Sequence, residues 1–525
     1  TSCNAGTTGG AVSSSYGNSF ISFESSTFTG CSADKGGGAL YFNQGNSNVS
    51  VEASTFTNCT SKVDGGATYF DSINLNTSIK SSSFSSCSAG QNGGSVFLGN
   101  GNDDFVVERS LFASNTAGDG AKKGIGGAIS AKDNNLRMAL LGGGVERRVW
   151  LVPRYTFNSL GPSYETPPYQ WEGDFKGFLV LFSPEVFFSR KGKFSVKSGS
   201  ETIVVYTLGS DFPGVNTTAL IVPGSSLSLS LTDNSDNCNN CVGSWGGFPV
   251  FIYGLLNSDK AGDTVKTSFL NNKAGISGGA VAMLQGNNAA VVLGVDVTDN
   301  KAGVGSGGGI YSQTANQYIS FIRTHFARNE AGLLGGGMAI EVSHSGVKVN
   351  NCSFVSNNAS SGGGLGLSTL NGISSIQSGT FPTNFGMDVS QSKFSSNEAS
   401  EGGAIYSLTT NAFVVTDSEI GYNMANSSGG GCFLGSSSQV VVQTSVMATN
   451  SAPTGGAIHV GEKSLLNVTS CGFMGNVADI SGGGMFLDSV EQLTFQGTVR
   501  LTSNSAGQHG GGLFLLDTPA WTASS

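Results

Sequence analysis

The sequence has few charged residues and no long apolar run, and both shortages narrow the class of protein. Only 12% of its 525 residues are charged, and the formal net charge is −9. No basic patch therefore suggests nucleic acid as a partner. A bilayer-crossing helix needs about 18 or more consecutive apolar residues, and the best candidate, GFLVLFSPEVFF, is broken at Pro184 and Glu185. We expect no nucleic-acid partner and no direct membrane span.

Glycine is abundant instead, at 79 residues, but it follows no Gly-X-Y period, which excludes a collagen-like chain. The mean hydropathy is +0.01, with many Val, Ile, Leu and Phe residues, so the chain has enough apolar surface to fold.

A pattern of Ser-x-Phe-x-x-Cys followed by Gly-Gly recurs at a constant interval near the start of the chain, as in STFTGCSADKGGG and STFTNCTSKVDGG. Later copies replace the cysteine with asparagine and keep nearly the same interval. Asn357 and Asn397 are 40 apart, so that repeat carries an extra loop. We call the Cys or Asn position of each repeat the anchor. The anchors are Cys3, Cys31, Cys59, Cys87, Asn115, Asn272, Asn300, Asn329, Asn357, Asn397, Asn423, Asn450, Asn476 and Asn504.

The repeats predict an all-β, right-handed parallel β-helix of about 14 coils, each of about 28 residues. Apolar residues alternate in runs such as ALYFN and VVVQTSV, which indicates short strands rather than helices. Equivalent residues then stack about 4.8 Å apart along the axis. We expect the anchors to form a buried side-chain ladder, and the Phe three residues before each anchor to form a stacked core.

The four cysteine anchors leave two alternatives open. Stacked Cα atoms about 4.8 Å apart fall inside the window for a disulfide, but Cβ atoms at the same spacing lie wider than is ideal. The four side chains could form two bridges or remain thiols.

An insertion interrupts one coil between Asn115 and Asn272. The predicted domains are N-terminal coils in 1–132, an insertion in 133–258 and C-terminal coils in 259–525. The insertion contains alternating runs such as TIVVYTL and PVFIYGL, which predict an antiparallel β-sandwich. Cys238 and Cys241 predict a local disulfide, because no further ligands for zinc lie nearby in sequence.

The second half of the insertion resembles the CUB-like β-sandwich modules of eukaryotic extracellular proteins. The resemblance rests on the Val222-Pro223-Gly224 turn, the TDNSDN loop and the Trp245-Gly246 pair. It implies calcium or glycan binding through such loops, with Asp233 and Asp236 as carboxylate candidates. A solvated loop is the alternative for these two residues.

The repeats resemble the polymorphic outer-membrane proteins of chlamydiae, through Phe-x-x-Asn and Gly-Gly-Ala-Ile motifs such as FSSNEASEGGAIYS. The resemblance implies a surface-exposed, adhesive or structural role. The cysteine anchors, the insertion and the lack of a C-terminal membrane barrel depart from that family and suggest a eukaryotic extracellular protein.

The sequence offers weak signs of catalysis. Glu24, Glu52, Lys80 and Glu108 share one column, seven residues before the anchor, but they lack an Arg or His partner. The four histidines, His325, His344, His459 and His509, share no column. We therefore predict no enzyme activity, no catalytic residue, no metal and no cofactor.

The predicted function is an extracellular or cell-surface structural protein that assembles head to tail with copies of itself, because both ends carry intact coil motifs without polar caps. The alternatives are an adhesin or carbohydrate-binding protein and, ranked lower, a polysaccharide lyase or hydrolase. Bound or covalent glycans are also expected. The candidate N-glycosylation sites are Asn48, Asn58, Asn76, Asn216, Asn351, Asn358, Asn426 and Asn467.

Overall fold

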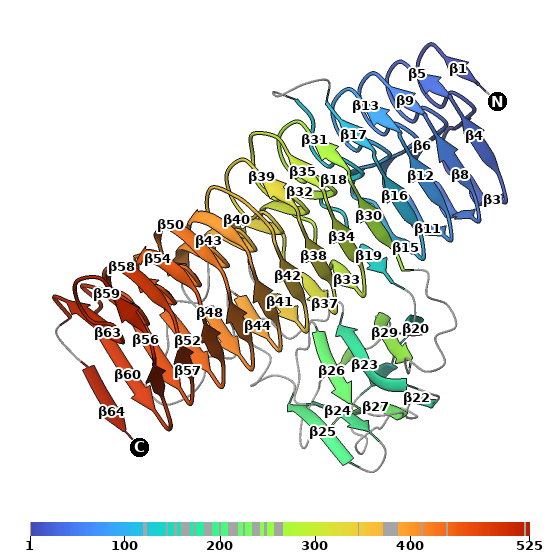
Figure 1. Ribbon diagram of the computed structural model, residues 1–525. Helices are drawn as coiled ribbons and strands as arrows, with labels where there is room; N and C mark the ends of the chain where they lie inside the picture. Colours follow the sequence, from blue (N-terminus) through green and yellow to red (C-terminus); the bar gives the residue numbers. More distant parts are fainter. Residues whose placement is uncertain are drawn as a thin grey trace. The chain divides into compact units, whose positions relative to one another are not determined.

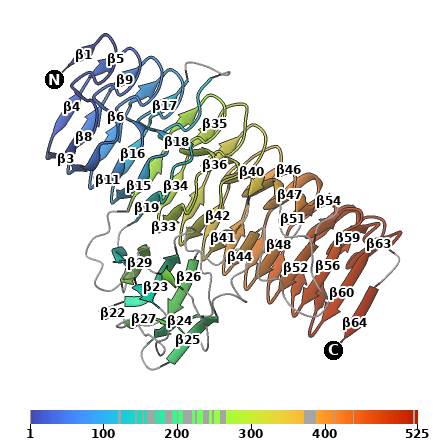
Figure 2. The same cartoon turned by 180° about the vertical axis from the view of Figure 1, so that it is seen from behind.

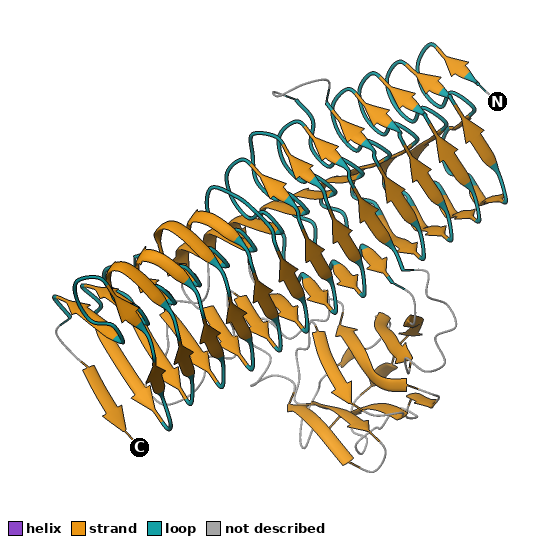
Figure 3. Cartoon of the chain, in the orientation of Figure 1, coloured by secondary structure: helices purple, strands orange, loops and turns teal. Residues whose placement is uncertain are grey.

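The computed structural model describes residues 2–118, 123–142, 266–344, 346–370, 387–410, 413–436, 439–518 and 521–524, together with ten strands between 145 and 256. The described elements are all strands, without a helix (Figure 3). No helix that could cross a membrane occurs among them. The chain divides into two compact units, 1–142 with 265–525, and 143–264.

The first unit is a parallel β-solenoid, which confirms the predicted fold class, and its winding is consistent with a right-handed β-helix (Figures 1 and 2). One coil runs through β5 (Ser32–Ala33), β6 (Leu40–Gln44), β7 (Ser47–Glu52) and β8 (Thr55–Thr57). Each strand pairs in parallel with its equivalent in the next coil, so that Phe42 lies opposite Phe70. The stacked strands form two sheets of 14 strands and one of 13, while the short strands after the anchors form sheets of eight and five.

One 14-stranded sheet positions the candidate site and is called the site sheet. Its strands are β2 (Val12–Ser14), β6, β10 (Thr68–Ser72), β14 (Val96–Asn100), β18 (Ile129–Asp133), β32 (Val281–Gln285), β36 (Ile310–Thr314), β40 (Met338–His344), β43 (Leu365–Leu370), β47 (Ile405–Thr410), β51 (Cys432–Leu434), β55 (Ile458–Val460), β59 (Met485–Asp488) and β63 (Leu513–Leu516).

The other 14-stranded sheet begins with β3 (Ser19–Glu24) and β7 and ends with β60 (Gln492–Gln496) and β64 (Trp521–Ser524). The 13-stranded sheet runs from β4 (Thr27–Thr29) to β61 (Arg500–Thr502). Period-2 alternation places one set of side chains inside: Val49 and Val51 are buried, whereas Glu52 at the end of the same strand is exposed.

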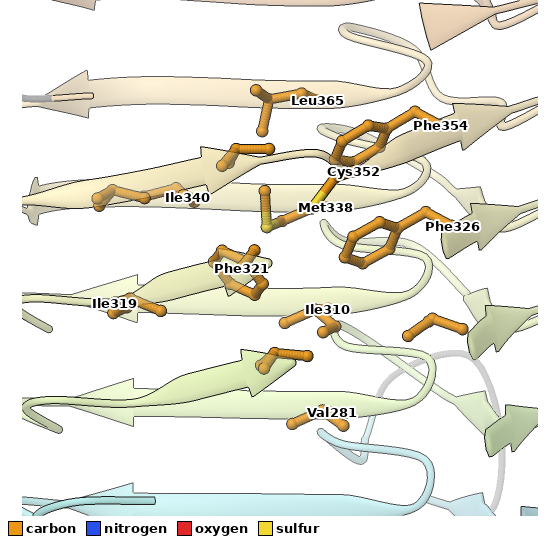
Figure 4. Close-up of a cluster of buried hydrophobic side chains, with 14 of the residues drawn as sticks. Val281, Ile310, Ile319, Phe321, Phe326, Met338, Ile340, Cys352, Phe354 and Leu365 are labelled. Carbon is orange, nitrogen blue, oxygen red and sulfur yellow. The ribbon is translucent and has the colours of Figure 1, made fainter. Parts of the chain in front are cut away.

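The interior is a stack of aromatic and aliphatic side chains, as the Phe column predicts. Phe354 is fully buried and stacks on Phe326, with ring centroids 4.6 Å apart (Figure 4). On its other side it stacks on Phe394, also at 4.6 Å. Phe112 and Phe269 stack at 4.9 Å even though the insertion separates them in sequence. The core therefore continues without a break across the insertion point.

The anchor asparagines form a hydrogen-bonded ladder at one corner of the coil. The backbone N–H and the side-chain amide of Asn115 both donate to Oδ1 of Asn272, each over 3.0 Å, and the amide also donates to the carbonyl of Phe84 over 3.0 Å. The same contacts recur along the later anchors as far as Asn504. Each buried amide thus finds partners in neighbouring coils, which satisfies groups that would be costly to bury alone.

A second asparagine ladder, which the sequence analysis missed, lies at the corner between the two 14-stranded sheets. Its members are Asn46, Asn74, Asn102, Asn135, Asn287 and Asn316. A serine ladder occupies the next corner, where, for example, the N–H of Ser54 donates to Oγ of Ser82 over 3.1 Å. The Gly-Gly pair forms the remaining corner: Gly37 has a φ of 62°, and a Cβ on Gly38 would lie 2.1 Å from the carbonyl oxygen of Gly66. Only glycine fits there.

The solenoid continues past Asp133 through β19 (Ala139–Leu141), which pairs with β15 (Asp103–Glu108) and β33 (Val291–Leu293). The second unit contains β20 (Val145–Leu151), β21 (Tyr155–Asn158), β22 (Tyr169–Glu172), β23 (Phe175–Phe182), β24 (Gly192–Ser198), β25 (Glu201–Thr207), β26 (Ala219–Pro223), β27 (Ser226–Asp233), β28 (Val242–Trp245) and β29 (Pro249–Leu256). They pair antiparallel in sheets of four, two and four strands. The packing of these sheets as a sandwich, and the CUB-like identity, stay predictions.

Candidate functional site

The outward face of the site sheet carries a column of aromatic side chains on successive coils. Strand register aligns Ser13, Tyr41, Tyr69, Phe97, Ser130, Ala282, Tyr311, Ala339, Gly366, Tyr406, Phe433, His459, Phe486 and Phe514. Rings therefore gather towards both ends of the sheet, and small side chains occupy most of the middle. Inward neighbours on the same strands, such as Phe42 and Phe70, are fully buried.

The N-terminal aromatic group surrounds the carboxylate of Asp71. The hydroxyl of Tyr41 donates to Oδ2 of Asp71 over 2.8 Å, and the hydroxyl of Tyr69 lies 3.4 Å from Oδ1. The ring of Tyr69 stands edge-on to those of Tyr41 and Phe97, with centroids 5.2 and 4.8 Å apart. Burial and the nearby carboxylate of Asp71 raise the pKa of both phenols, so both remain protonated donors.

A second carboxyl, Asp64, lies in the turn that leads into β10. It accepts hydrogen bonds from the backbone N–H and the side-chain amide of Asn92, over 3.1 and 3.0 Å. Burial raises the pKa of Asp64, although these hydrogen bonds and the charge of Lys132 act in the opposite direction. The carboxyl is thus held in an environment that favours its protonated form more than water does.

Asp64 and Asp71 belong to one coil and flank Tyr69. The charges of both raise the pKa of the Tyr69 phenol, which places the two carboxyls within electrostatic reach of one side chain. Both aspartates are partly exposed and therefore accessible to a ligand on this face. We call Asp64, Asp71, Tyr41, Tyr69 and Asn92 the carboxylate cluster. It contains one carboxyl with a raised pKa and one that accepts two phenol hydrogen bonds.

Glu341 forms a smaller site on the same face, where it accepts hydrogen bonds from Tyr311 over 2.7 Å and Ser306 over 2.9 Å. Among the described residues no second carboxylate is bonded into this group. Towards the C-terminal end, Tyr406, Phe433 and His459 stack face to face at 5.2 and 5.1 Å. Their faces cover one another, so this stack presents ring edges to solvent.

The column of Glu24, Glu52, Lys80 and Glu108 is in register on consecutive strands, as the spacing predicts. Glu108 forms an ion pair with Arg109 over 3.2 Å. His325 contacts Ser353, His344 is fully buried beside Ser312, His459 lies in the aromatic stack, and His509 stacks on Phe514. Among the described residues no group of three or more potential ligands could hold a metal ion.

The cysteine anchors take the place of asparagine in the ladder. Cys3, Cys31, Cys59 and Cys87 are thiols, as are Cys352, Cys432 and Cys471. Sγ of Cys59 lies 3.6 Å from the carbonyl oxygen of Phe28, the contact that Asn115 makes with Phe84. The thiol thus reproduces part of the asparagine geometry. Cys238, Cys241, Asp236 and Asn216 lie outside the described residues, and Asp233 ends β27.

The remaining candidate glycosylation sites lie on the solenoid. Asn58, Asn76, Asn351, Asn358 and Asn426 are exposed, and Asn48 and Asn467 are partly exposed. Their glycosylation stays a prediction.

The sequence analysis missed the carboxylate cluster because it searched for acidic residues in one column on consecutive coils. Asp64 and Asp71 lie in different columns of a single coil, five and twelve residues after the anchor Cys59. The sequence did contain an indication of this site, since the aromatic residues Tyr41, Tyr69 and Phe97 recur once per coil near these aspartates.

No family model and no curated protein matches this sequence. Solved structures do match. The catalytic domain of a GH87 alpha-1,3-glucanase in complex with nigerose has 9% identity and a TM-score of 0.27, covering 73% of this chain and 99% of that chain. Another complex of this catalytic domain with nigerose has 8% identity and a TM-score of 0.23 at the same coverage. A structure described as a glycoside hydrolase has 10% identity and a TM-score of 0.19, covering 80% and 89% of the two chains.

These matches correct two predictions. The matched structures are described as glycoside hydrolases, which contradicts the predictions of a structural filament protein and of no enzyme activity. The TM-scores are all 0.27 or lower, so the chemistry of this chain is argued from the cluster itself.

Proposed function

We propose that this chain is a polysaccharide hydrolase whose reacting carboxyls are Asp64 and Asp71. The observation that carries the proposal is the pairing, around Tyr69, of one carboxyl with a raised pKa and another that accepts phenol hydrogen bonds. Glycoside hydrolases use two carboxyl groups with different protonation, an acid and a base or nucleophile.

Asp64 acts as the general acid. Burial raises its pKa and so favours the protonated form, and its proton passes to the glycosidic oxygen as the bond from the anomeric carbon to that oxygen breaks. The two hydrogen bonds from Asn92 orient the carboxyl. Asp71, as a carboxylate, either removes a proton from the attacking water or attacks the anomeric carbon itself. In both routes one water molecule is consumed and one new reducing end is formed.

Tyr41 and Tyr69 hold the Asp71 carboxylate and provide aromatic surface for a sugar ring. The cluster holds two carboxyls, and the positive charge of Lys132 acts on one of them, Asp64. A polyuronide would be repelled by this charge distribution, so the geometry favours a neutral polysaccharide. The matched catalytic domains act on alpha-1,3-glucan, which makes that polymer the first substrate to test.

The test is the release of reducing ends from a panel of neutral polysaccharides, alpha-1,3-glucan among them, by the full chain. Asp64→Asn and Asp71→Asn should each lower the rate at least 100-fold, because each removes a group needed in the transition state. Asp488→Asn is the matched control, since Asp488 occupies the column of Asp71 on the same face in β59. Equal rates in all four proteins, or no turnover of any substrate, would refute the proposal.

A further inference from the structure

The four cysteine anchors are stacked on consecutive coils, and three of them are shielded from solvent. Cys31, Cys59 and Cys87 are fully buried, and Cys3 is partly exposed on the first coil. The strands that flank Cys59 and Cys87 are in register, with Thr57 opposite Ser85 and Thr60 opposite Ser88. The two cysteines therefore occupy equivalent positions one coil apart.

The Cys59 and Cys87 side chains also touch. Contact with the sulfur of Cys59, together with burial, raises the pKa of the Cys87 thiol. Each thiol also lies beside a backbone carbonyl oxygen of the preceding coil, that of Phe28 for Cys59 and that of Phe56 for Cys87. Parallel strands place equivalent Cα atoms about 4.8 Å apart, within the range of about 4.4–6.8 Å found for disulfides. The Cβ atoms must approach by about 1 Å to reach the usual spacing.

We propose that Cys59 and Cys87 form a disulfide in an oxidising medium, and that this bond closes the coil between them into a covalent ring. The ring spans the one-coil interval that contains Asp64, Tyr69 and Asp71. Formation of the bond does not depend on the hydrolase activity proposed above.

The oxidant is a small disulfide such as oxidised glutathione. The Cys59 thiolate attacks one sulfur of this compound and releases one glutathione thiolate, forming a mixed disulfide. The Cys87 thiolate then attacks the Cys59 sulfur and releases the second glutathione. Two protein thiols are oxidised, one glutathione disulfide is reduced, and the two thiol protons end on the released glutathione at neutral pH. Because both sulfurs are buried, exchange takes place during folding or transient opening of the coil.

The chain supplies its own controls. Cys352, Cys432 and Cys471 are also buried, but none has a cysteine opposite it in a neighbouring coil. Cys352 is followed in its ladder by Ser392, and Cys432 lies between Ile405 and Ile458 in β47 and β55. Burial alone would leave all these thiols equally reduced, whereas stacking gives Cys59 and Cys87 a neighbouring thiol that Cys352, Cys432 and Cys471 lack.

The test is disulfide mapping of the full chain after refolding in a glutathione redox buffer, with alkylation of free thiols before digestion. We expect a linked peptide pair containing Cys59 and Cys87, together with alkylated Cys352, Cys432 and Cys471. The oxidised protein should unfold at a higher temperature than the reduced protein. Cys59 and Cys87 alkylated as completely as Cys432, or Cys59 linked mainly to Cys31, would overturn the proposal.

A double variant, Cys59→Asn with Cys87→Asn, separates the bond from general effects of oxidation. Asparagine is the usual ladder residue, so this variant should fold. Its unfolding temperature should be the same in oxidised and reduced glutathione. If the variant shows the same redox dependence as the parent protein, the Cys59–Cys87 bond is not its source.

Discussion

The hydroxyl of Tyr41 donates to Oδ2 of Asp71 over 2.8 Å, although the two residues belong to different coils. Tyr41 belongs to the aromatic column, and it lies 30 residues before Asp71 in the sequence. A parallel solenoid makes such pairs possible because each coil lays its side chains beside those of the next. The candidate site, from Tyr41 to Asn92, is therefore a property of three consecutive coils.

Replacing Asp71 with Asn should lower the pKa of the Tyr41 phenol. Burial raises that pKa first, and the hydrogen bond to the Asp71 carboxylate and its negative charge raise it further. Removal of the charge leaves burial and the smaller effect of Tyr16, and it makes the phenolate less unfavourable. Spectrophotometric titration at alkaline pH measures the change, with Tyr41→Phe identifying the signal of Tyr41. An unchanged titration in Asp71→Asn would contradict this account of the pair.

Replacing Phe354 with Ala should lower the free energy of unfolding by about 3–5 kcal/mol. Its ring is fully buried between those of Phe326 and Phe394, so truncation leaves a cavity in the stack. Phe433→Ala is the matched control, because Phe433 stacks on its neighbours but lies on the partly exposed outward face. Denaturant unfolding of both variants gives the comparison. Equal losses would show that the inner stack is not the main source of stability.

Replacing Asn357 with Ala should cost roughly 2–4 kcal/mol, because it leaves several buried groups without partners. The N–H and the amide of Asn329 both donate to Oδ1 of Asn357, and the amide of Asn357 donates to the carbonyl of Phe326. The adjacent Asn358 has an exposed side chain, so Asn358→Ala should change stability by less than about 0.5 kcal/mol. Similar losses for the two variants in denaturant unfolding would argue against the ladder.

Stability should fall as the pH drops below about 6.5, in part because of His344. This side chain is fully buried beside Ser312, and burial lowers its pKa to about 4. Between about pH 6.5 and pH 4 the unfolded chain binds one more proton at this residue than the folded chain. The stabilising contribution is therefore complete above about pH 6.5 and is lost towards pH 4, with a maximum slope of about 1.4 kcal/mol per pH unit.

His344→Asn should flatten this part of the pH–stability profile measured by chemical unfolding at several pH values. Asparagine is compatible with the site, since Ser312 also accepts a hydrogen bond from Asn316 of the second ladder. His509→Asn provides the control, because His509 is exposed. A profile unaffected by His344→Asn would mean that other groups produce the pH dependence.

The solenoid could be predicted from the sequence alone, because the residues that build it recur from coil to coil. Most coils have Phe three residues before the anchor, Asn at the anchor and Gly-Gly after it. Each of these positions has the same surroundings in every coil, so the length of the repeat gives the length of one coil. The second asparagine ladder was equally accessible, since Asn46, Asn74 and Asn102 are spaced by one repeat each. This ladder was missed because the repeats were compared mainly at positions near the anchor.

Only the tertiary structure decided which outward-facing residues meet. Asp64 follows a turn and Asp71 lies on a strand, and no periodicity links them, because a site that occurs once leaves no repeat in the sequence. Their common electrostatic effect on Tyr69 depends on the bend of the coil and on the orientation of the Tyr69 ring against its neighbours. The hydrogen bonds and ring stacks that build the solenoid recur from coil to coil, whereas the carboxylate cluster depends on how side chains from three different columns meet across neighbouring coils.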